Sequence, residues 1–324
     1  MLASSPVSSF IVAWVLDRSH QLSRPSADGL AALVREVAPR SKVVRWRRLG
    51  GGLSTATHVV DVRSAAGNTT AFVVKRYRPG DTSAPEEWAK LRFAQGVDVP
   101  SPEPVALDRR GEWFGTPAVV MTKLSGRPYL SPSDPDAYLG QLAEAQLTIQ
   151  SASVARAPAV IRRVRSRPDQ PPWTGLRPTE LVERAADIVE RGRPAALASD
   201  LRLGHGDLHP GNTVWARGKL AGIADWRHAA VAPRAYEVAY TRVDLSVLFG
   251  PTAADRFLDE YLRRWGGELE HLDVFDLGQG LAAMRWAHYW ALAYREQGRR
   301  DLTDAKAKRR ARDFVRRVLE RRAG

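Results

Sequence analysis

The sequence contains no cysteine among its 324 residues. Disulfide bonds and thiolate chemistry are therefore excluded, and a reducing compartment is the natural expectation. Long hydrophobic runs are missing as well. The run FIVAWVL at residues 10–16 is too short to span a bilayer, and no basic segment precedes it as a signal peptide requires. We therefore expect a cytoplasmic protein without a membrane partner.

Negative charge is scarce: 36 Asp and Glu face 49 Lys and Arg, for a net charge of +13. About half of this excess lies in residues 295–324, which carry twelve basic and five acidic side chains. Such a tail can bind nucleic acid. However, apolar residues recur in it at helical spacing, which favours a helix with one buried and one solvated face. They are Ala311, Phe314, Val315 and Val318.

The chain has a strand-rich part followed by a longer helical part. Residues 42–77 alternate apolar and polar side chains around two glycine-containing turns, which predicts three antiparallel strands. Residues 83–96 read as a helix with Ser83 as its N-cap. Two further strands are predicted, one at the end of the Pro-rich segment 99–108 and one in the apolar run at residues 116–126. Beyond about residue 126, apolar residues with a period of about 3.6 predict helices.

We therefore expect an α+β fold, with a small antiparallel-sheet lobe and a larger, mostly helical lobe. The expected boundaries are a helical extension at residues 1–40, a strand-rich unit at 41–124 and a helical unit at 125–324. A hinge is expected near residues 122–126. Residues 153–177 are rich in Arg and Pro and are expected to form a loop.

The segment GHGDLHPGN, residues 204–212, carries the candidate chemistry. Two short apolar runs follow it on either side of the turn RGK and predict a hairpin. Asp207 and Asn212 then precede the first strand, and Asp225 ends the second. Three oxygen-bearing side chains would converge there, which suits a hard cation such as magnesium.

A different metal chemistry is also conceivable for this segment. His205, Asp207 and His209 form the pattern H-x-D-x-H, and His228 lies just past the hairpin. These groups could build the zinc or two-metal centre of a hydrolase. That hypothesis leaves Asn212 and the upstream glycine-rich hairpin without a role. A polar turn without chemistry is the third alternative.

The spacing of Asp207 and Asn212 equals that of the kinase catalytic loop H-R-D-L-x-x-x-N, and IADW stands where protein kinases carry D-F-G. HGDLHPGN followed by IADW resembles the aminoglycoside phosphotransferase and choline kinase family of the protein-kinase-like fold. The resemblance covers about residues 43–295. It implies a two-lobed enzyme that uses ATP or GTP with Mg²⁺ and transfers the γ-phosphoryl group to a hydroxyl of a small molecule.

The resemblance also implies residue roles in the helical lobe. Asp207 would orient the acceptor hydroxyl and take its proton, and Asn212 and Asp225 would hold magnesium against the nucleotide phosphates. His205 and His209 would orient the loop through hydrogen bonds.

In the strand-rich lobe, the resemblance implies nucleotide binding. Lys75 follows a Val pair on the third strand, as the kinase β3 lysine does. Its expected partner is Glu87, selected over Glu86 by alignment on Leu91. Phosphate and main-chain adenine contacts are expected from the glycine-rich turn and the hinge strand. These residues are Gly51, Gly52, Ser54 and Thr55, and Met121, Thr122 and Leu124.

The sequence departs from the family pattern at two places. Residues 144–153 lack the His that many members carry at the end of the first helix of this lobe. After ADW, the chain offers Ala-Pro and then Glu237 where many members have Gly-Pro and Asp. We expect Glu237 to anchor the catalytic loop in place of that Asp.

The acceptor is left open by the sequence, as is the oligomeric state. Seven acids between Asp255 and Asp276 could bind a polycation or form a solvated face. An aromatic stripe could form a wall for a ring or pack in the core, and an arginine cluster could receive an anionic or neutral acceptor. These groups are Trp286, Tyr289, Trp290 and Tyr294, and Arg162, Arg163, Arg165 and Arg167.

Two competing functions complete the expectations. One is a non-catalytic nucleotide- or ligand-binding protein on the same fold, against which the presence of Asp207, Asn212, Asp225 and Lys75 argues. The other is nucleic-acid binding by the basic tail. Under the phosphotransferase hypothesis, removing residues 300–324 is expected to largely spare phosphoryl transfer.

Overall fold

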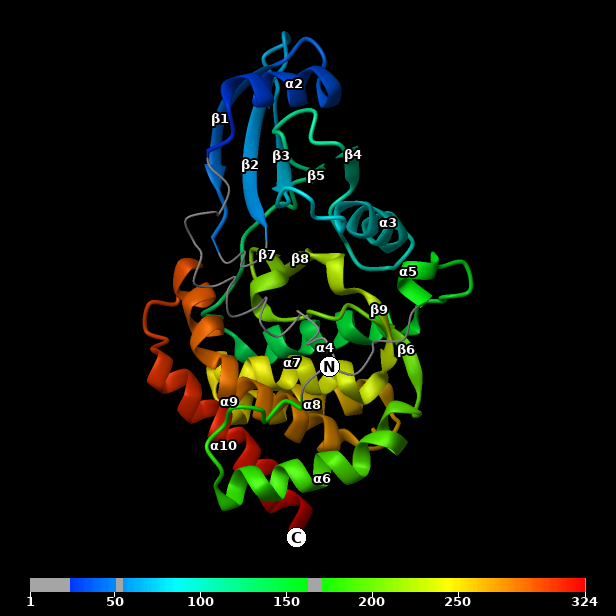
Figure 1. Ribbon diagram of the computed structural model, residues 1–324, viewed down its shortest axis with the longest axis vertical. Coiled ribbons are helices and arrows are strands. Elements are labelled where there is room, and N and C mark those ends of the chain that lie inside the picture. Colours follow the sequence, from blue (N-terminus) through cyan, green and yellow to red (C-terminus); the bar gives the residue numbers. More distant parts are fainter. Residues whose placement is uncertain (1–23, 51–54, 163–170, 324) are drawn as a thin grey trace, which may run out of the picture. The chain divides into compact units, whose positions relative to one another are not determined.

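The structure is a computed structural model that describes residues 24–50, 55–162 and 171–323 (Figure 1). Its internal contacts divide the chain into two compact units. The first comprises the chain up to Gly96 together with Ser101–Leu124, and the second comprises Val97–Pro100 and the chain from Ser125 onward. Across the described ranges, no helix combines the length and the apolar character needed to span a lipid bilayer.

The first unit is built on an antiparallel sheet, which in the described residues has five strands in the order β1-β2-β3-β5-β4. The predicted strands and the helix after them are confirmed, and a helix precedes the sheet as well. The elements are α2 (Ala27–Val37), β1 (Lys42–Arg48), β2 (Ala56–Arg63), β3 (Thr69–Arg76), α3 (Ala84–Ala94), β4 (Pro104–Asp108) and β5 (Ala118–Thr122).

The two faces of this sheet differ because side chains alternate along β2 and β3. One face packs apolar side chains against α2; the buried residues are Val60, Val62, Phe72 and Val74 of the sheet and Leu30, Leu33 and Val34 of α2. Lys75 lies on the other face, paired in register with Thr57. Arg76 returns to the α2 face, where its guanidinium lies 5.1 Å from the centre of the Phe114 ring. The predicted opposite orientation of Lys75 and Arg76 is confirmed.

The predicted N-cap position of α3 is confirmed, but the serine side chain does not cap the helix. Ser83 occupies the N-cap position but its side chain makes no capping hydrogen bond. Instead, the Ser83 hydroxyl and main-chain N–H both donate to Asp81 Oδ1, at 2.6 and 2.8 Å. The Asp81 carboxylate takes the hydrogen bond of the Ser83 hydroxyl, because Asp side chains readily accept from groups two residues further along the chain.

The second unit is mostly helical, as predicted. Its helices are α4 (Pro135–Ser151), α5 (Ala159–Arg162), α6 (Glu180–Leu197), α7 (Arg234–Phe249), α8 (Pro251–Trp265), α9 (Leu272–Glu296) and α10 (Asp304–Ala323). The predicted hairpin is present as β7 (Thr213–Ala216) and β8 (Lys219–Ile223). Two elements were not predicted: the short helix α5 within the expected loop, and an antiparallel pair of strands, β6 (Leu201–Gly204) and β9 (Ala230–Pro233).

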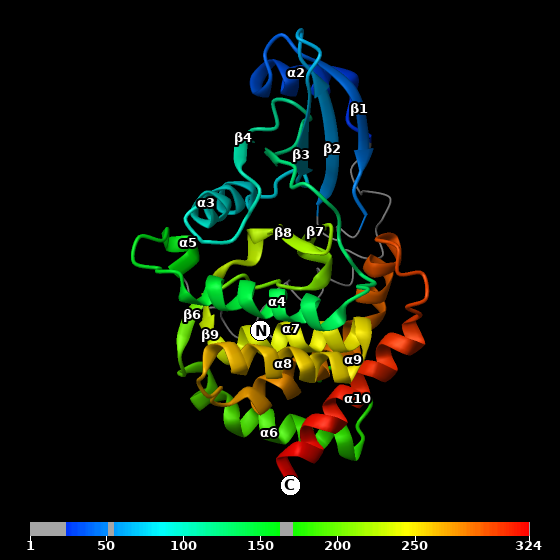
Figure 2. The ribbon, with the colours of Figure 1, turned by 180° about the vertical axis from the view of Figure 1, so that it is seen from behind.

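Helix α7 is enclosed by α8, α9 and α10 (Figures 1 and 2). Most of its residues are buried, including the charged side chain of Arg242. Arg242 donates to Asp276 and, at 3.1 Å, to Asp255 of α8. Burial lowers the pKa of Arg242 to about 9, with nearby Arg321 adding to the effect.

The basic C-terminal segment forms α10, and its predicted apolar face is buried in the helical core. The buried residues are Ala307, Ala311, Phe314, Val315, Val318 and Leu319. Arg317 and Arg321 of the same helix contact Asp255 at 2.6 and 2.8 Å. This burial argues against the expectation that removing residues 300–324 largely spares phosphoryl transfer, because the truncation would expose the core of the second unit.

Candidate active site

The segment 205–212 connects strand β6 to the β7–β8 hairpin. A short 3₁₀ turn at Pro210–Asn212 carries the chain into β7, and Thr213 then pairs with Ile223 across the hairpin. The Ala224 N–H donates to the Asn212 carbonyl at 2.9 Å. Asn212 and Asp225 therefore flank the open end of the hairpin, as the sequence predicted. Asp225 adopts a left-handed conformation, with φ 64° and ψ 57°.

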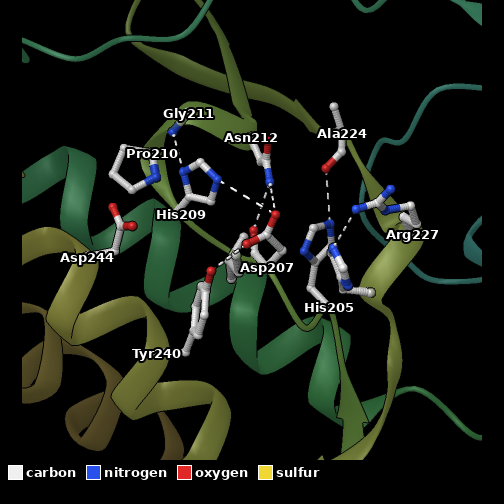
Figure 3. Close-up of polar contacts among 12 residues, drawn as sticks. His205, Asp207, His209, Pro210, Gly211, Asn212, Ala224, Arg227, Tyr240 and Asp244 are labelled. Carbon is white, nitrogen blue, oxygen red and sulfur yellow. Dashed lines mark hydrogen bonds and ion pairs between the residues drawn. The ribbon is translucent and has the colours of Figure 1, made fainter. Parts of the chain in front are cut away.

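Asp207 and Asn212 are joined by two hydrogen bonds (Figure 3). Asn212 Nδ2 donates to Asp207 Oδ2 at 3.0 Å and to the Asp207 carbonyl at 2.9 Å. These two acceptors fix the orientation of the amide, since only its nitrogen can donate. The Asn212 Oδ1 atom is therefore directed away from Asp207 and is the atom that can bind a cation.

The Asp207 carboxylate is contacted from further directions. The Tyr240 hydroxyl of α7 donates to Oδ1, and His209 Nε2 lies 3.9 Å from Oδ2. Burial opposes ionisation of this carboxyl, but His209, His228 and the Tyr240 hydrogen bond together hold its pKa below the usual value. Asp207 is therefore ionised at neutral pH, and its side chain is 24% exposed to solvent.

His205 is buried behind the loop and ties it to the hairpin. Its Nε2 atom lies 3.0 Å from the Ala224 carbonyl, and because a carbonyl only accepts, Nε2 carries the proton. The ring packs edge-on against Trp226, with 4.9 Å between the centroids. Burial lowers the pKa of His205 to about 4. His205 is thus a neutral side chain that ties the start of the loop to Ala224, the residue before Asp225.

His209 lies within the loop and turns its other nitrogen away from Asp207. Nδ1 accepts from the Gly211 N–H at 3.1 Å and lies 3.2 Å from the Tyr294 hydroxyl of α9. That hydroxyl in turn donates to Asp244 of α7. In the described part of the chain, no three His, Asp or Glu side chains are grouped so that they could hold a metal ion. The described residues therefore offer no cluster of ligands for the metal centre of a hydrolase.

Helix α7 anchors the loop through several polar side chains. Glu237 Oε2 accepts from the Gly206 N–H at 2.9 Å, and the Thr241 hydroxyl donates to the Leu208 carbonyl at 3.0 Å. The anchoring by Glu237 was predicted, whereas Tyr240, Thr241 and Asp244 were missed. Their spacing along one helix is the signal that could have found them.

In the first unit, Lys75 and Glu87 form a buried ion pair. Lys75 Nζ lies 2.5 Å from Glu87 Oε1, and the two side chains are 6% and 2% exposed. The Tyr77 hydroxyl donates to the other carboxylate oxygen of Glu87. Sequence reasoning missed Tyr77, although alternation along the chain from Lys75 places it on the same face.

The other predicted nucleotide contacts are only partly described. Gly51, Gly52 and Ser54 lie outside the described residues, and Thr55 is buried at the start of β2. Met121 is buried on β5. The Thr122 and Lys123 N–H groups donate to carbonyls of Glu103 and Ala71. The Leu124 carbonyl accepts from Lys123 Nζ at 3.0 Å and keeps a second lone pair.

Many of the candidate acceptor groups form ion pairs or pack against other side chains of the second unit. Of the seven acids, Asp255, Glu260, Asp273 and Asp276 form ion pairs with arginines of the same unit. Tyr294 is buried in the core and Trp290 packs against it. Trp286 and Tyr289 are half-buried and stack on one another at 5.7 Å. Arg162 is exposed, and Arg163, Arg165 and Arg167 lie outside the described residues.

Solved structures share this fold at low sequence identity. A thermostable mutant of aminoglycoside phosphotransferase APH(4)-Ia is 18% identical, with a TM-score of 0.62 over 89% of this chain and 98% of that chain. Amicoumacin kinase is 13% identical, with a TM-score of 0.56 over 90% and 92%. Macrolide 2′-phosphotransferase of Brachybacterium faecium is 18% identical, with a TM-score of 0.53 over 88% and 97%. No curated protein matches the sequence.

The predicted two-lobed, protein-kinase-like fold class is confirmed by these likenesses and by the composition of the two units. The model of the phosphotransferase enzyme family matches residues 45–277. This range includes the ion pair of Lys75 and Glu87, the loop around Asp207, and the hairpin with Asp225 just after it. Because that match covers more than two thirds of the sequence, the chain belongs to the phosphotransferase enzyme family.

Proposed function

We propose that this enzyme transfers the γ-phosphoryl group of ATP, or of GTP, to a hydroxyl of a small molecule. The observation that carries the proposal is the arrangement of the catalytic loop. Asp207 is ionised and hydrogen-bonded to Asn212, and the hairpin brings Asp225 to the same open end. The first unit would act as the nucleotide-binding lobe, and the second would supply the catalytic loop, the metal ligands and the acceptor site.

Asp207 is proposed as the residue that orients the acceptor hydroxyl and takes its proton. A carboxylate with a lowered pKa is a weak base, but phosphoryl transfer requires positioning and charge neutralisation more than a strong base. Its hydrogen-bonded partners restrict the orientation of the carboxylate, which favours this positioning role. His205 and His209 would support the loop without contacting the substrates.

Asn212 and Asp225 fit the role of magnesium ligands. Both offer oxygen atoms, which magnesium prefers, and the Asn212 amide oxygen is left available because its nitrogen donates to Asp207. Two protein ligands suffice, because magnesium completes its shell with water and phosphate oxygens. When bound, the ion would neutralise charge on the phosphates.

The buried pair of Lys75 and Glu87 fits a phosphate-contacting lysine held by a helix carboxylate. The Tyr77 hydrogen bond to Glu87 would restrict that carboxylate further. Two structures that share the fold support nucleotide and divalent-cation use. APH(4)-Ia was crystallised with ADP and hygromycin B, and amicoumacin kinase with AMP-PNP, Ca²⁺ and its antibiotic.

The acceptor is proposed to be an antibiotic, a sugar or an amino alcohol. The fold relatives named above act on aminoglycosides, amicoumacin and macrolides. The ion pairs of the acids between Asp255 and Asp276 argue against a polycation bound by that segment. We propose no nucleic-acid partner, since basic side chains of α10 pair with carboxylates of the same unit: Arg317 and Arg321 with Asp255, and Arg322 with Asp273.

The first prediction tests these roles. Asp207→Asn removes the carboxylate that orients the acceptor, and Asp225→Ala removes a metal ligand. Each change is expected to lower turnover by at least about 100-fold while the protein stays folded. Magnesium-dependent ATP consumption would be measured over a panel of aminoglycosides, macrolides, sugars and amino alcohols, which would also identify the acceptor.

Asp313→Asn is the matched control, because Asp313 lies on α10 and pairs with Arg316 of the same helix at 2.8 Å. Its turnover should equal that of the unaltered enzyme. Retained turnover in Asp207→Asn or Asp225→Ala would refute the assigned roles. Nucleotide binding without turnover on any acceptor would favour the non-catalytic alternative.

A further inference from the structure

We propose that Tyr240 is a positioning residue for Asp207, acting through the hydrogen bond from its hydroxyl to Oδ1 of the carboxylate. This inference rests on the proposed function, because it assigns to Tyr240 an effect on turnover that requires Asp207 to contact the acceptor. Tyr240 itself would not touch substrate or nucleotide.

The two oxygens of the Asp207 carboxylate have different donors. Tyr240 donates to Oδ1 from α7, and Asn212 donates to Oδ2 from the loop itself (Figure 3). One donor on each oxygen fixes the rotation of the carboxylate plane about the Cβ–Cγ bond. Each carboxylate oxygen has about two lone-pair sites, so an acceptor hydroxyl can still donate to the remaining ones.

The Tyr240 side chain can exert this control because its backbone is fixed. Val238, Ala239 and Val243, on either side of it, are fully buried in the second unit. Glu237 and Thr241 of the same helix hold Gly206 and Leu208, the residues that flank Asp207. The loop backbone is thus held without Tyr240, which leaves the Tyr240 hydroxyl to determine the direction of the carboxylate.

The critical variant is Tyr240→Phe, which keeps the ring and removes only the hydroxyl. A misdirected catalytic group costs rate without costing ground-state binding. We therefore expect kcat to fall by about 10-fold or more, while KM for ATP stays within about twofold. The thermal midpoint should stay within about 3 °C of the unaltered enzyme.

Steady-state ATP turnover would be measured with water and with each active acceptor of the panel. Tyr236→Phe is the matched control: Tyr236 lies one turn earlier on α7 and packs against Phe275, with 5.6 Å between the centroids. Its kcat should not change. An unchanged kcat in Tyr240→Phe, or a fall matched by the same fall in Tyr236→Phe, would overturn the inference.

A double-mutant cycle separates this inference from the proposed function. If Tyr240 acts through Asp207, adding Tyr240→Phe to Asp207→Asn should change kcat by less than about twofold. A full multiplicative loss would show that Tyr240 acts independently and would overturn the inference alone. Full turnover in Asp207→Asn by itself would overturn the proposed function, and the inference with it.

Discussion

Among the described residues, His58 on β2 and His205 behind the loop that carries Asp207 are buried as neutral side chains. The pKa of each is lowered to about 4, in both cases first because burial penalises the imidazolium. For His58, the nearby guanidinium groups of Arg76 and Arg48 lower it further. The His58 ring also meets Trp46 edge-on, with 5.6 Å between the centroids. Each unit therefore contains a histidine whose pKa is lowered in the folded protein and returns to its usual value when the protein unfolds.

These shifts predict a loss of stability in mild acid. The unfolded chain takes up protons on its histidines near pH 6.5, whereas folded His58 remains neutral down to about pH 4. The contribution of His58 to the free energy of unfolding is therefore fully present above about pH 6.5. It decreases as the pH drops towards 4, and below pH 4 this group causes no further loss. The loss attributable to His58 is about 3 kcal/mol.

Urea unfolding between pH 7.5 and 4.5 would measure this loss, with His58→Gln as the comparison. The variant should lose less stability over this range, because glutamine does not titrate. Parallel pH profiles for the two proteins would contradict the prediction.

At the scale of elements, α7 connects the proposed catalytic loop to the helical core. Its polar residues Glu237, Tyr240 and Thr241 reach the loop, while apolar residues of the same helix are buried among α8, α9 and α10. Asp244, one turn beyond Tyr240, accepts from the Tyr294 hydroxyl of α9, and burial raises its pKa. The hydroxyl thereby links α7, α9 and His209.

Tyr294→Phe should test this link. The change leaves the buried Asp244 carboxyl without its Tyr294 donor, so we expect a loss of about 1–3 kcal/mol in unfolding free energy. Adding Asp244→Leu removes the other partner and should recover part of the loss. Urea unfolding of the single and double variants measures both effects; a double variant less stable than Tyr294→Phe would count against the explanation.

The elements that the sequence predicted are those with a local signal. The β7–β8 hairpin follows from apolar runs around a turn, and the neighbouring positions of Asp207 and Asn212 follow from their spacing. The β6–β9 ladder was missed because its four-residue strands pair across a long stretch of chain. Tyr240, Thr241 and Asp244 of α7 were missed because the helix is buried on nearly all sides, so their helical spacing does not stand out as a separate polar face.

At the scale of the whole molecule, the C-terminal helix is a structural part of the second unit. Its apolar face closes the core formed with α7 and α9 (Figure 2), and Leu302 just before it is fully buried. The sequence predicted that this helix has one apolar face. Its periodicity could not show how many side chains of the core pack against that face, so the effect of removing the helix was underestimated. The basic residues occupy its solvated face, as predicted.

Truncation after Arg300 is therefore expected to unfold the second unit. It removes several large buried side chains, each worth about 2–5 kcal/mol, against a typical total stability of about 5–15 kcal/mol. Circular dichroism and thermal unfolding would show the loss. Replacing exposed Lys308 and Arg312 by Gln is the control and should leave the midpoint within about 3 °C. A truncated protein with a native midpoint would disprove the expectation.

Asp255 gives this architecture a practical consequence. It binds Arg317 and Arg321 of the last helix and Arg242 of α7, and Arg242 directly follows Thr241, which holds the catalytic loop. Helix α10 is thus connected to the loop that carries Asp207 through the Asp255 carboxylate, the Arg242 guanidinium and the adjacent Thr241, which donates to Leu208. Substitutions of the arginines of α10 that contact Asp255 are therefore expected to affect the loop that carries Asp207 as well as the helical core.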